Sequence, residues 1–238
     1  MKKILFAVVA LTMFAGNAKA LEFEPQEGFT WMGIFGMNVS NLKNHDFGAK
    51  AGATMGARAD YVLPKAHGTY LTAGIDWTMK GAKGSEYHEV NGEGYEPTAK
   101  YALHYFEVPI RVGFRYNITE GIGFFGEVGP YFAVGVGGRH RISFSEDGSE
   151  FRDAEDENSY KAFKNYGYPT ESFQRWDAGI GFRIGAEYNH HYNLMFGCDW
   201  GLADIYRVSL RDAVKDNDGI NLPKVRNFNF SITFGYRL

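Results

Sequence analysis

Histidines, one cysteine and loop carboxylates are the side chains in this sequence whose types could support catalysis or metal binding. Seven histidines are spread along the 238 residues. His190 and His191 are adjacent, so in an extended segment their side chains would point to opposite faces and would not form a metal site by themselves. Cys198 is the single cysteine, which excludes an internal disulfide. These residues therefore predict no catalytic, cofactor-binding or metal-binding set.

Acidic side chains gather in two stretches that could supply oxygen ligands to calcium. Residues 146–157 hold seven carboxylates, and residues 216–219 read Asp-Asn-Asp-Gly. Neither stretch has the twelve-residue spacing of an EF-hand. Solvated loops are the favoured interpretation, and no cofactor is predicted. Calcium binding by these loops stays an alternative.

Two further patterns suggest enzymatic chemistry that their context does not support. Residues 121–126 match the glycine spacing of a dinucleotide-binding loop, but that loop needs a strand before it and a helix after it. These glycines lie in a segment that alternates like a strand. His140, Ser143 and Ser145 could belong to an enzyme acting on lipid A, but no spacing joins them into a triad. An enzyme is therefore not predicted, and this activity is kept as an alternative.

The N-terminal residues have the pattern of an export signal. Lys2 and Lys3 precede an apolar run over residues 4–14, and Ala18-Lys19-Ala20 supplies a small-x-small cleavage site. We expect residues 1–20 to be a signal peptide that is removed, and residues 21–28 to be a short periplasmic segment. Without the three lysines of the signal, 22 basic residues face 28 acidic ones. This acidic balance, with no basic cluster interleaved with aromatics, argues against nucleic-acid binding.

Strict alternation of apolar and polar side chains indicates long β-strands. Between residues 106 and 116 every even position is apolar, whereas Glu107, Arg111 and Arg115 occupy odd positions. A strand places alternate side chains on opposite faces, and a helix would scramble this pattern. Eight segments pass the same test: residues 29–39, 47–61, 71–79, 101–116, 122–136, 176–188, 192–202 and 228–238.

The lengths of these segments and of their connections predict a membrane barrel. A tilted strand needs roughly 9–11 residues to cross a bilayer, more than the roughly 5–6 of an average soluble strand. Connections that are long or polar (residues 40–46, 81–100, 138–171 and 203–225) alternate with short ones (residues 63–68, 117–120 and 189–190). We therefore predict an all-β fold for residues 29–238. It is an eight-stranded antiparallel transmembrane β-barrel, an up-and-down meander with long extracellular loops and short periplasmic turns, in the outer membrane.

The inward face of such a barrel would carry many charges of both signs. About eight strands leave an interior just wide enough to be filled by side chains, so we expect a packed, ion-paired lumen, with a narrow pore as the alternative. Because proline lacks an N–H, we also expect a bulge at residues 107–110, around Pro109. The predicted lumen charges are Lys50, Arg58, Lys80, Arg111, Arg115, Arg175, Arg183 and Arg237 against Asp60, Asp76, Glu107, Glu127, Asp177, Glu187 and Asp199.

Several short motifs resemble one known family. Residues 103–110 (LHYFEVPI), 113–116 (GFRY), 129–132 (GPYF), 177–181 (DAGIG) and 235–238 (GYRL) are similar to strand motifs of the PorT-like outer-membrane β-barrel family of bacteroidetes. The resemblance implies an outer-membrane barrel from a family in which most members have no assigned biochemical activity. It also implies, as an alternative role, an accessory component of a protein secretion system, because the name-giving member is linked to one.

The function favoured by these observations is that of a non-enzymatic outer-membrane barrel with a structural role or an interaction role carried by its loops. Expected partners are outer-membrane lipids and lipopolysaccharide, the barrel-assembly machinery during insertion, and a protein at the extracellular loops. Aromatic side chains suited to recognition lie in those loops. They are Tyr87, Tyr95, Tyr160, Tyr166 and Tyr168.

Overall fold

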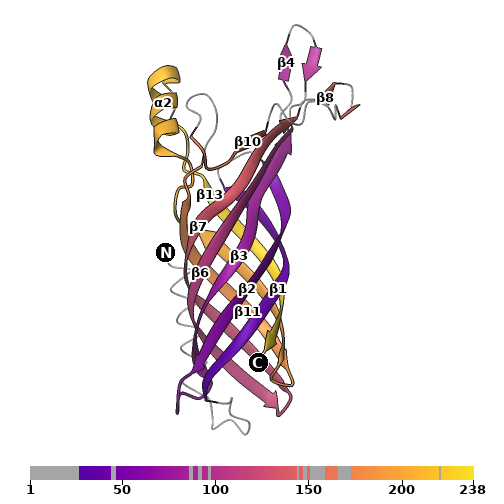
Figure 1. The fold of residues 1–238 in the computed structure, drawn as a ribbon, viewed down its shortest axis with the longest axis vertical. Coiled ribbons are helices and arrows are strands. Elements are labelled where there is room, and N and C mark those ends of the chain that lie inside the picture. The colour runs from indigo at the N-terminus through magenta and orange to yellow at the C-terminus, as the bar shows by residue number, and fades with distance from the viewer. Residues whose placement is uncertain are drawn as a thin grey trace.

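Eight long antiparallel strands form a closed ring in the computed structural model (Figure 1). The structure describes residues 27–43, 47–85, 88–90, 93–95, 98–143, 145–146, 149–150, 159–165, 173–219 and 221–238. The long strands are β1 (Gly28–Lys43), β2 (Gly48–Val62), β3 (Thr69–Ser85), β6 (Thr98–Thr119), β7 (Ile122–Ser143), β11 (Trp176–Tyr188), β12 (Tyr192–Gly201) and β13 (Arg226–Arg237).

Each long strand pairs with the next along the chain, and β13 pairs back with β1. This last pairing sets Met32–Lys43 against Arg226–Arg237 and leaves no free edge among the eight. All eight predicted segments are strands, so the prediction of an antiparallel up-and-down ring is confirmed. The predicted signal peptide and nearly all of the segment 21–28 lie outside the described residues, and they stay predictions.

Strands and a helix occupy stretches that the sequence predicted as loops. β6 and β7 each have 22 residues and continue past the alternating segments. The outward-facing side chains stop being apolar before these strands end, but backbone pairing continues, so hydrophobic periodicity underestimates strand length. The added elements are β4 (His88–Val90), β5 (Glu93–Tyr95), β8 (Ser145–Glu146), β9 (Ser149–Glu150), β10 (Ser159–Lys161) and α2 (Val208–Asp218).

The helix α2 and strand β10 belong to the end of the barrel with the long connections, drawn uppermost in Figure 1. β10 pairs with Arg139–Arg141 of β7, above the point where β11 begins to pair with that strand. Residues 216–219, predicted as an oxygen-rich loop, form the end of α2, where Gly219 adopts a left-handed φ of 69°. No helix among the described residues is long and apolar enough to cross a bilayer.

The bulge predicted around Pro109 is absent. Pairing of β6 with both neighbours keeps one register on either side of this residue. The ladder to β3 simply lapses opposite Val108 and Pro109, so the missing N–H is tolerated without an added residue. The register shift in this part of β6 lies between His104 and Tyr105 instead, opposite the glycine-rich segment 135–138.

The strands alternate between an exposed apolar face and a buried polar one. On β6, Phe106, Val108 and Ile110 are 41–50% exposed, whereas Glu107 and Arg111 are 3% exposed. The other long strands show similar outward-facing apolar side chains. Together they form an apolar belt around the outside, and the charged side chains are placed inside the ring.

Candidate functional site

Thirteen of the fifteen charged residues predicted for the lumen are buried inside the ring. Their exposed fractions are 5% or less, and they form ion pairs that link strands far apart in the sequence. The thirteen are Arg58, Lys80, Arg111, Arg115, Arg183 and Arg237 with Asp60, Asp76, Glu107, Glu127, Asp177, Glu187 and Asp199.

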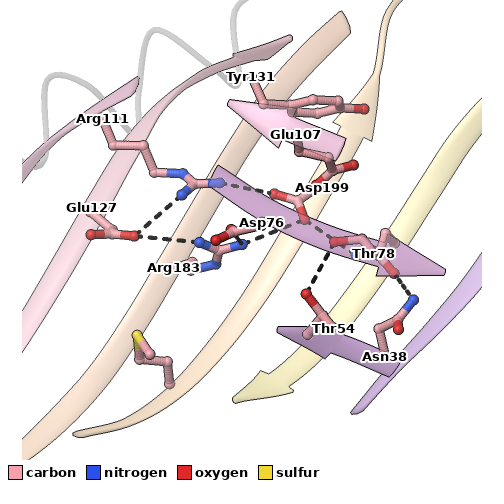
Figure 2. A network of polar contacts seen from close by, with 12 residues as sticks. Asn38, Thr54, Asp76, Thr78, Glu107, Arg111, Glu127, Tyr131, Arg183 and Asp199 are labelled. Carbon is pink, nitrogen blue, oxygen red and sulfur yellow. Dashed lines mark hydrogen bonds and ion pairs between the residues drawn. The ribbon is translucent and has the colours of Figure 1, made fainter. Parts of the chain in front are cut away.

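Six of these residues form a network midway along the barrel. Glu127 of β7 is its centre, because Arg58 and Arg111 each approach its Oε1 to 3.5 Å and Arg183 approaches to 3.8 Å. Figure 2 shows the guanidinium groups of Arg111 and Arg183 directed at Glu127 from different strands. Asp76 and Asp199 complete the set, at 2.7 Å from Arg58 and 3.4 Å from Arg111. Three cations are thus matched by three anions.

Neutral polar side chains extend this network to β1 and β13. Asn229 of β13 donates to Asp199 at 3.3 Å and accepts from Asn38 of β1 at 2.7 Å. Thr54 and Thr78 share a hydrogen bond of 3.0 Å across β2 and β3 (Figure 2). The polar layer therefore involves all eight strands of the ring.

A second charged group lies near the short turns. Asp60 lies 3.2 Å from Arg115 and 3.0 Å from Arg237. Glu187 pairs with the same two arginines. The group joins β2, β6, β11 and β13. An apolar cluster of Met32, Ile34, Val62, Tyr70, Phe125 and Met195 lies beside it. Tyr70 of this cluster touches both charged groups, because its hydroxyl donates to Glu127 at 3.2 Å and the Arg115 guanidinium lies 4.8 Å from the centre of its ring.

A third charged group lies toward the long connections. Lys80 pairs with Glu107 and lies 3.4 Å from Asp177, with its ammonium 4.5 Å from the centre of the Tyr131 ring. Asn227 also donates to Asp177, at 2.8 Å. Burial of charged and polar side chains costs free energy unless they are paired. In all three groups each carboxylate lies next to at least one arginine or lysine.

An apolar cluster lies above the third group and includes residues from the predicted loops. Phe163 packs edge-on against Tyr105, and Phe173 packs against Tyr101. Ile205 and Tyr206 complete the cluster from the other long connection. Phe163, Ile205 and Tyr206 were not predicted as core residues because their stretches do not alternate. The signal that could have identified them is the presence of large apolar side chains within stretches that are otherwise polar.

Two residues predicted for the lumen lie elsewhere. Lys50 is half-buried and its Nζ lies 3.6 Å from Sδ of Met79, on the outer side next to His104. A register shift between β2 and β3, from Ala49 to Thr54, lies at this position and breaks simple alternation. Arg175 is exposed, because it precedes β11 and donates instead to the carbonyl of Gly135.

Among the residues that the structure describes, those considered for enzymatic or metal chemistry are not assembled into a site. His140 is buried and stacks on Tyr101, with ring centres 4.5 Å apart. The side chains of Ser143 and Ser145 lie outside the described part of the structure. His190 lies in the short turn before β12, and Cys198 lies on the outward face of β12. Among the described residues there is no group of three or more His, Cys, Asp or Glu side chains that could hold a metal ion.

Comparisons with known proteins point to one family. A family described as "Outer membrane protein beta-barrel domain" matches residues 17–207. Neisserial surface protein A is 12% identical, with 90% of this chain and 99% of that chain covered and a TM-score of 0.41. Ail, the attachment invasion locus protein of Yersinia pestis, is 13% identical, with 90% of this chain and 100% of that chain covered and a TM-score of 0.40. OprG from Pseudomonas aeruginosa is 10% identical, with 91% of this chain and 99% of that chain covered and a TM-score of 0.39. A search of curated protein sequences finds no match.

Proposed function

This chain belongs to the outer-membrane protein β-barrel domain family, and we propose that it is a non-enzymatic barrel whose lumen is closed to ions. In this role the barrel holds its long connections at the outer surface, where they contact lipids, lipopolysaccharide or a protein partner. Residues 1–20 direct export and are removed, and the barrel-assembly machinery inserts the rest. The strand motifs at residues 103–110 and 177–181 support placement near the PorT-like proteins.

The buried central network is the observation that carries this proposal. Arg58, Arg111 and Arg183 reach across the ring to shared carboxylates, so their side chains occupy the path that an ion would take. The interior of a ring of about eight strands is narrow enough for such side chains to fill it. The charged group around Asp60 and the apolar cluster around Phe163 lie on either side of the network along the same path.

Ion conductance in planar bilayers tests the closed lumen. The purified, refolded protein is expected to give no steady openings, whereas a general porin reconstituted in the same way conducts. A variant with Arg111→Ala and Arg183→Ala, shown by heat-modifiable migration to be folded, is expected to conduct because two large side chains leave the central network. Steady large-conductance openings of the unmodified protein would overturn the proposal.

The absence of enzymatic activity is tested separately. His140 faces a tyrosine in the buried interior and not the lipid, which supports a role without lipid A chemistry. Lipid A extracted from cells that express the protein is expected to keep its mass. A mass shift that disappears with His140→Ala would favour the enzyme instead.

A further inference from the structure

The outer surface of the barrel carries a cluster of cations that the sequence does not reveal. Lys83, Lys100, Arg139, Arg141 and Lys161 come from four strands, β3, β6, β7 and β10. In the strand pairing Lys83 is directly opposite Lys100, Lys100 is opposite Arg141, and Arg139 is opposite Lys161. We call these five residues the basic rim. Their neighbours Tyr101 and His140 are buried, so the rim side chains lie on the outer face.

Cations placed directly opposite each other on adjacent strands destabilise a sheet. Within the described residues, Lys83, Lys100, Arg139 and Arg141 form no ion pair, unlike the arginines of the lumen. Lys100, Arg139 and Arg141 line a hollow of about 740 Å³, together with Lys50 and Arg175. Positive charge is therefore concentrated around a hollow, and an anion that fits the hollow would neutralise it.

The position of the hollow identifies the kind of anion. On β6 the outward residues change from Phe106 and Val108, in the apolar belt, to His104 and then Lys100 within six residues. On β7, Val136 is exposed and Arg139 follows three residues later. His104 stacks on Trp77, with ring centres 5.5 Å apart, at this boundary. Aromatic side chains are typical of the interface between hydrocarbon and headgroups. The basic rim thus lies at the headgroup level of a bilayer that covers the belt.

We propose that the basic rim and its hollow bind the phosphate groups of lipopolysaccharide in the outer leaflet. Guanidinium groups such as those of Arg139 and Arg141 bind phosphate oxygens in pairs, and basic pockets at the membrane surface bind anionic headgroups. The apolar belt directly below, at Val136 and Phe106, accommodates the acyl chains of the same molecule. A soluble polyanion has no acyl chains, so it would contact the hollow but not the apolar belt next to it. The proposal rests on the barrel's placement in the outer membrane and is independent of a closed lumen.

Binding of lipid A to the purified barrel tests the proposal. Native mass spectrometry measures the fraction of the barrel that carries bound lipid A. The probes are bisphosphorylated lipid A and the same lipid A after removal of its phosphates. The double variant Lys100→Gln and Arg141→Gln is expected to bind bisphosphorylated lipid A roughly tenfold or more weakly, because each cation near a charged headgroup contributes to affinity. Dephosphorylated lipid A is expected to bind weakly to both the variant and the unmodified protein.

The barrel offers a matched control on another part of its wall. Lys43 of β1 is directly opposite Arg226 of β13, and its ammonium lies 4.7 Å from the centre of the Phe228 ring. The double variant Lys43→Gln and Arg226→Gln removes the same number of opposed cations outside the hollow. It is expected to keep its affinity for bisphosphorylated lipid A. An equal loss in both double variants would mean general charge attraction and would overturn the site.

Stability without lipid separates binding from folding. Removing opposed cations relieves repulsion, so Lys100→Gln with Arg141→Gln is expected to unfold in detergent at the same temperature as the unmodified protein or at a higher one. A lower unfolding temperature would assign these cations a structural role and contradict the proposal. Competition by millimolar inorganic phosphate as effective as that by lipid A would also overturn it, because the site would then hold free anions. Conductance of these variants is expected to be unchanged, which distinguishes this test from that of the closed lumen.

Discussion

At the scale of single residues, one carboxylate holds most of the central network together. Glu127 lies within 3.8 Å of three guanidinium groups and accepts a hydrogen bond from Tyr70 at 3.2 Å. Its side chain is 4% exposed, so the charges around it have little access to water. Removing one partner of a buried pair leaves the others uncompensated, and this costs more than the pair itself contributes.

Glu127→Gln is therefore expected to lower the free energy of unfolding by about 3–5 kcal/mol. Urea titration of the barrel refolded into lipid vesicles, followed by tryptophan fluorescence, measures the change. Glu120→Gln is the control, because Glu120 is exposed in the turn before β7. A change of less than about 0.5 kcal/mol for Glu127→Gln, as for an ordinary surface substitution, would contradict the role of Glu127 as the centre of the network.

Alternation alone placed most lumen charges correctly, because a strand has only two faces. It was wrong for Lys50, where a register shift interrupts the alternation, and for Arg175, which precedes its strand. The basic rim was not predicted because Lys100 and Arg141 are distant in the sequence and meet only through the pairing of β6 with β7. The ion-pair partners of each lumen charge also depend on which strands face each other across the ring. Hydrophobic periodicity gives no information on this arrangement.

At the scale of elements, the turn between β11 and β12 shows a local conflict between residue type and conformation. Asn189 and His190 adopt left-handed φ values of 55° and 61°. Asparagine and histidine reach this region more often than most residues with a side chain, but the Cβ of each still crowds the backbone there, a cost that glycine avoids. His190 also lies 3.4 Å from Glu187, but its side chain is 55% exposed, so this contact contributes little.

His190→Gly is expected to raise the free energy of unfolding by up to about 1 kcal/mol, because glycine reaches positive φ without this crowding. The same urea titration measures it. His190→Ala removes the imidazole and its contact with Glu187 but keeps a Cβ, so it is expected to show no gain. Equal stability of the glycine and alanine variants would show that the turn is not strained.

The elements differ in how much of them the sequence predicts. All eight barrel strands were found, since an exposed apolar face on one side and packed charges on the other impose strict alternation. β10 and α2 were not, because neither contributes to the apolar belt and their stretches lack that constraint. The upper ends of β6 and β7 were missed for the same reason: above the belt, both faces of a strand meet polar surroundings.

At the scale of the whole molecule, one seam closes the ring. β1 and β13 are separated by the full length of the barrel domain and pair over twelve residues. Lipid offers no hydrogen bonds to an open strand edge, so this pairing is required in a membrane. Met37 and Ile232 lie opposite each other at the seam and both point outward, with exposed fractions of 72% and 47%.

Met37→Cys with Ile232→Cys, in a Cys198→Ser background, is expected to form a disulfide under mild oxidation, because Cα atoms directly opposite on paired strands are within disulfide range. A shift in mobility on non-reducing electrophoresis detects it. Ile110→Cys with Ile232→Cys is the control, since Ile110 lies on β6, which does not pair with β13. Cross-linking of the control pair but not of the seam pair would exclude the closed ring.

The same seam has a consequence for the order in which the barrel folds. Arg237 of β13 is one of the two cations that hold Asp60 and Glu187, so that group of charges is balanced only after the seam has formed. A barrel halted before this step would keep two carboxylates with one arginine between them, in contact with water or lipid. Late folding intermediates are therefore penalised electrostatically as well as by their open edges, and we expect insertion to finish in one cooperative event and not strand by strand.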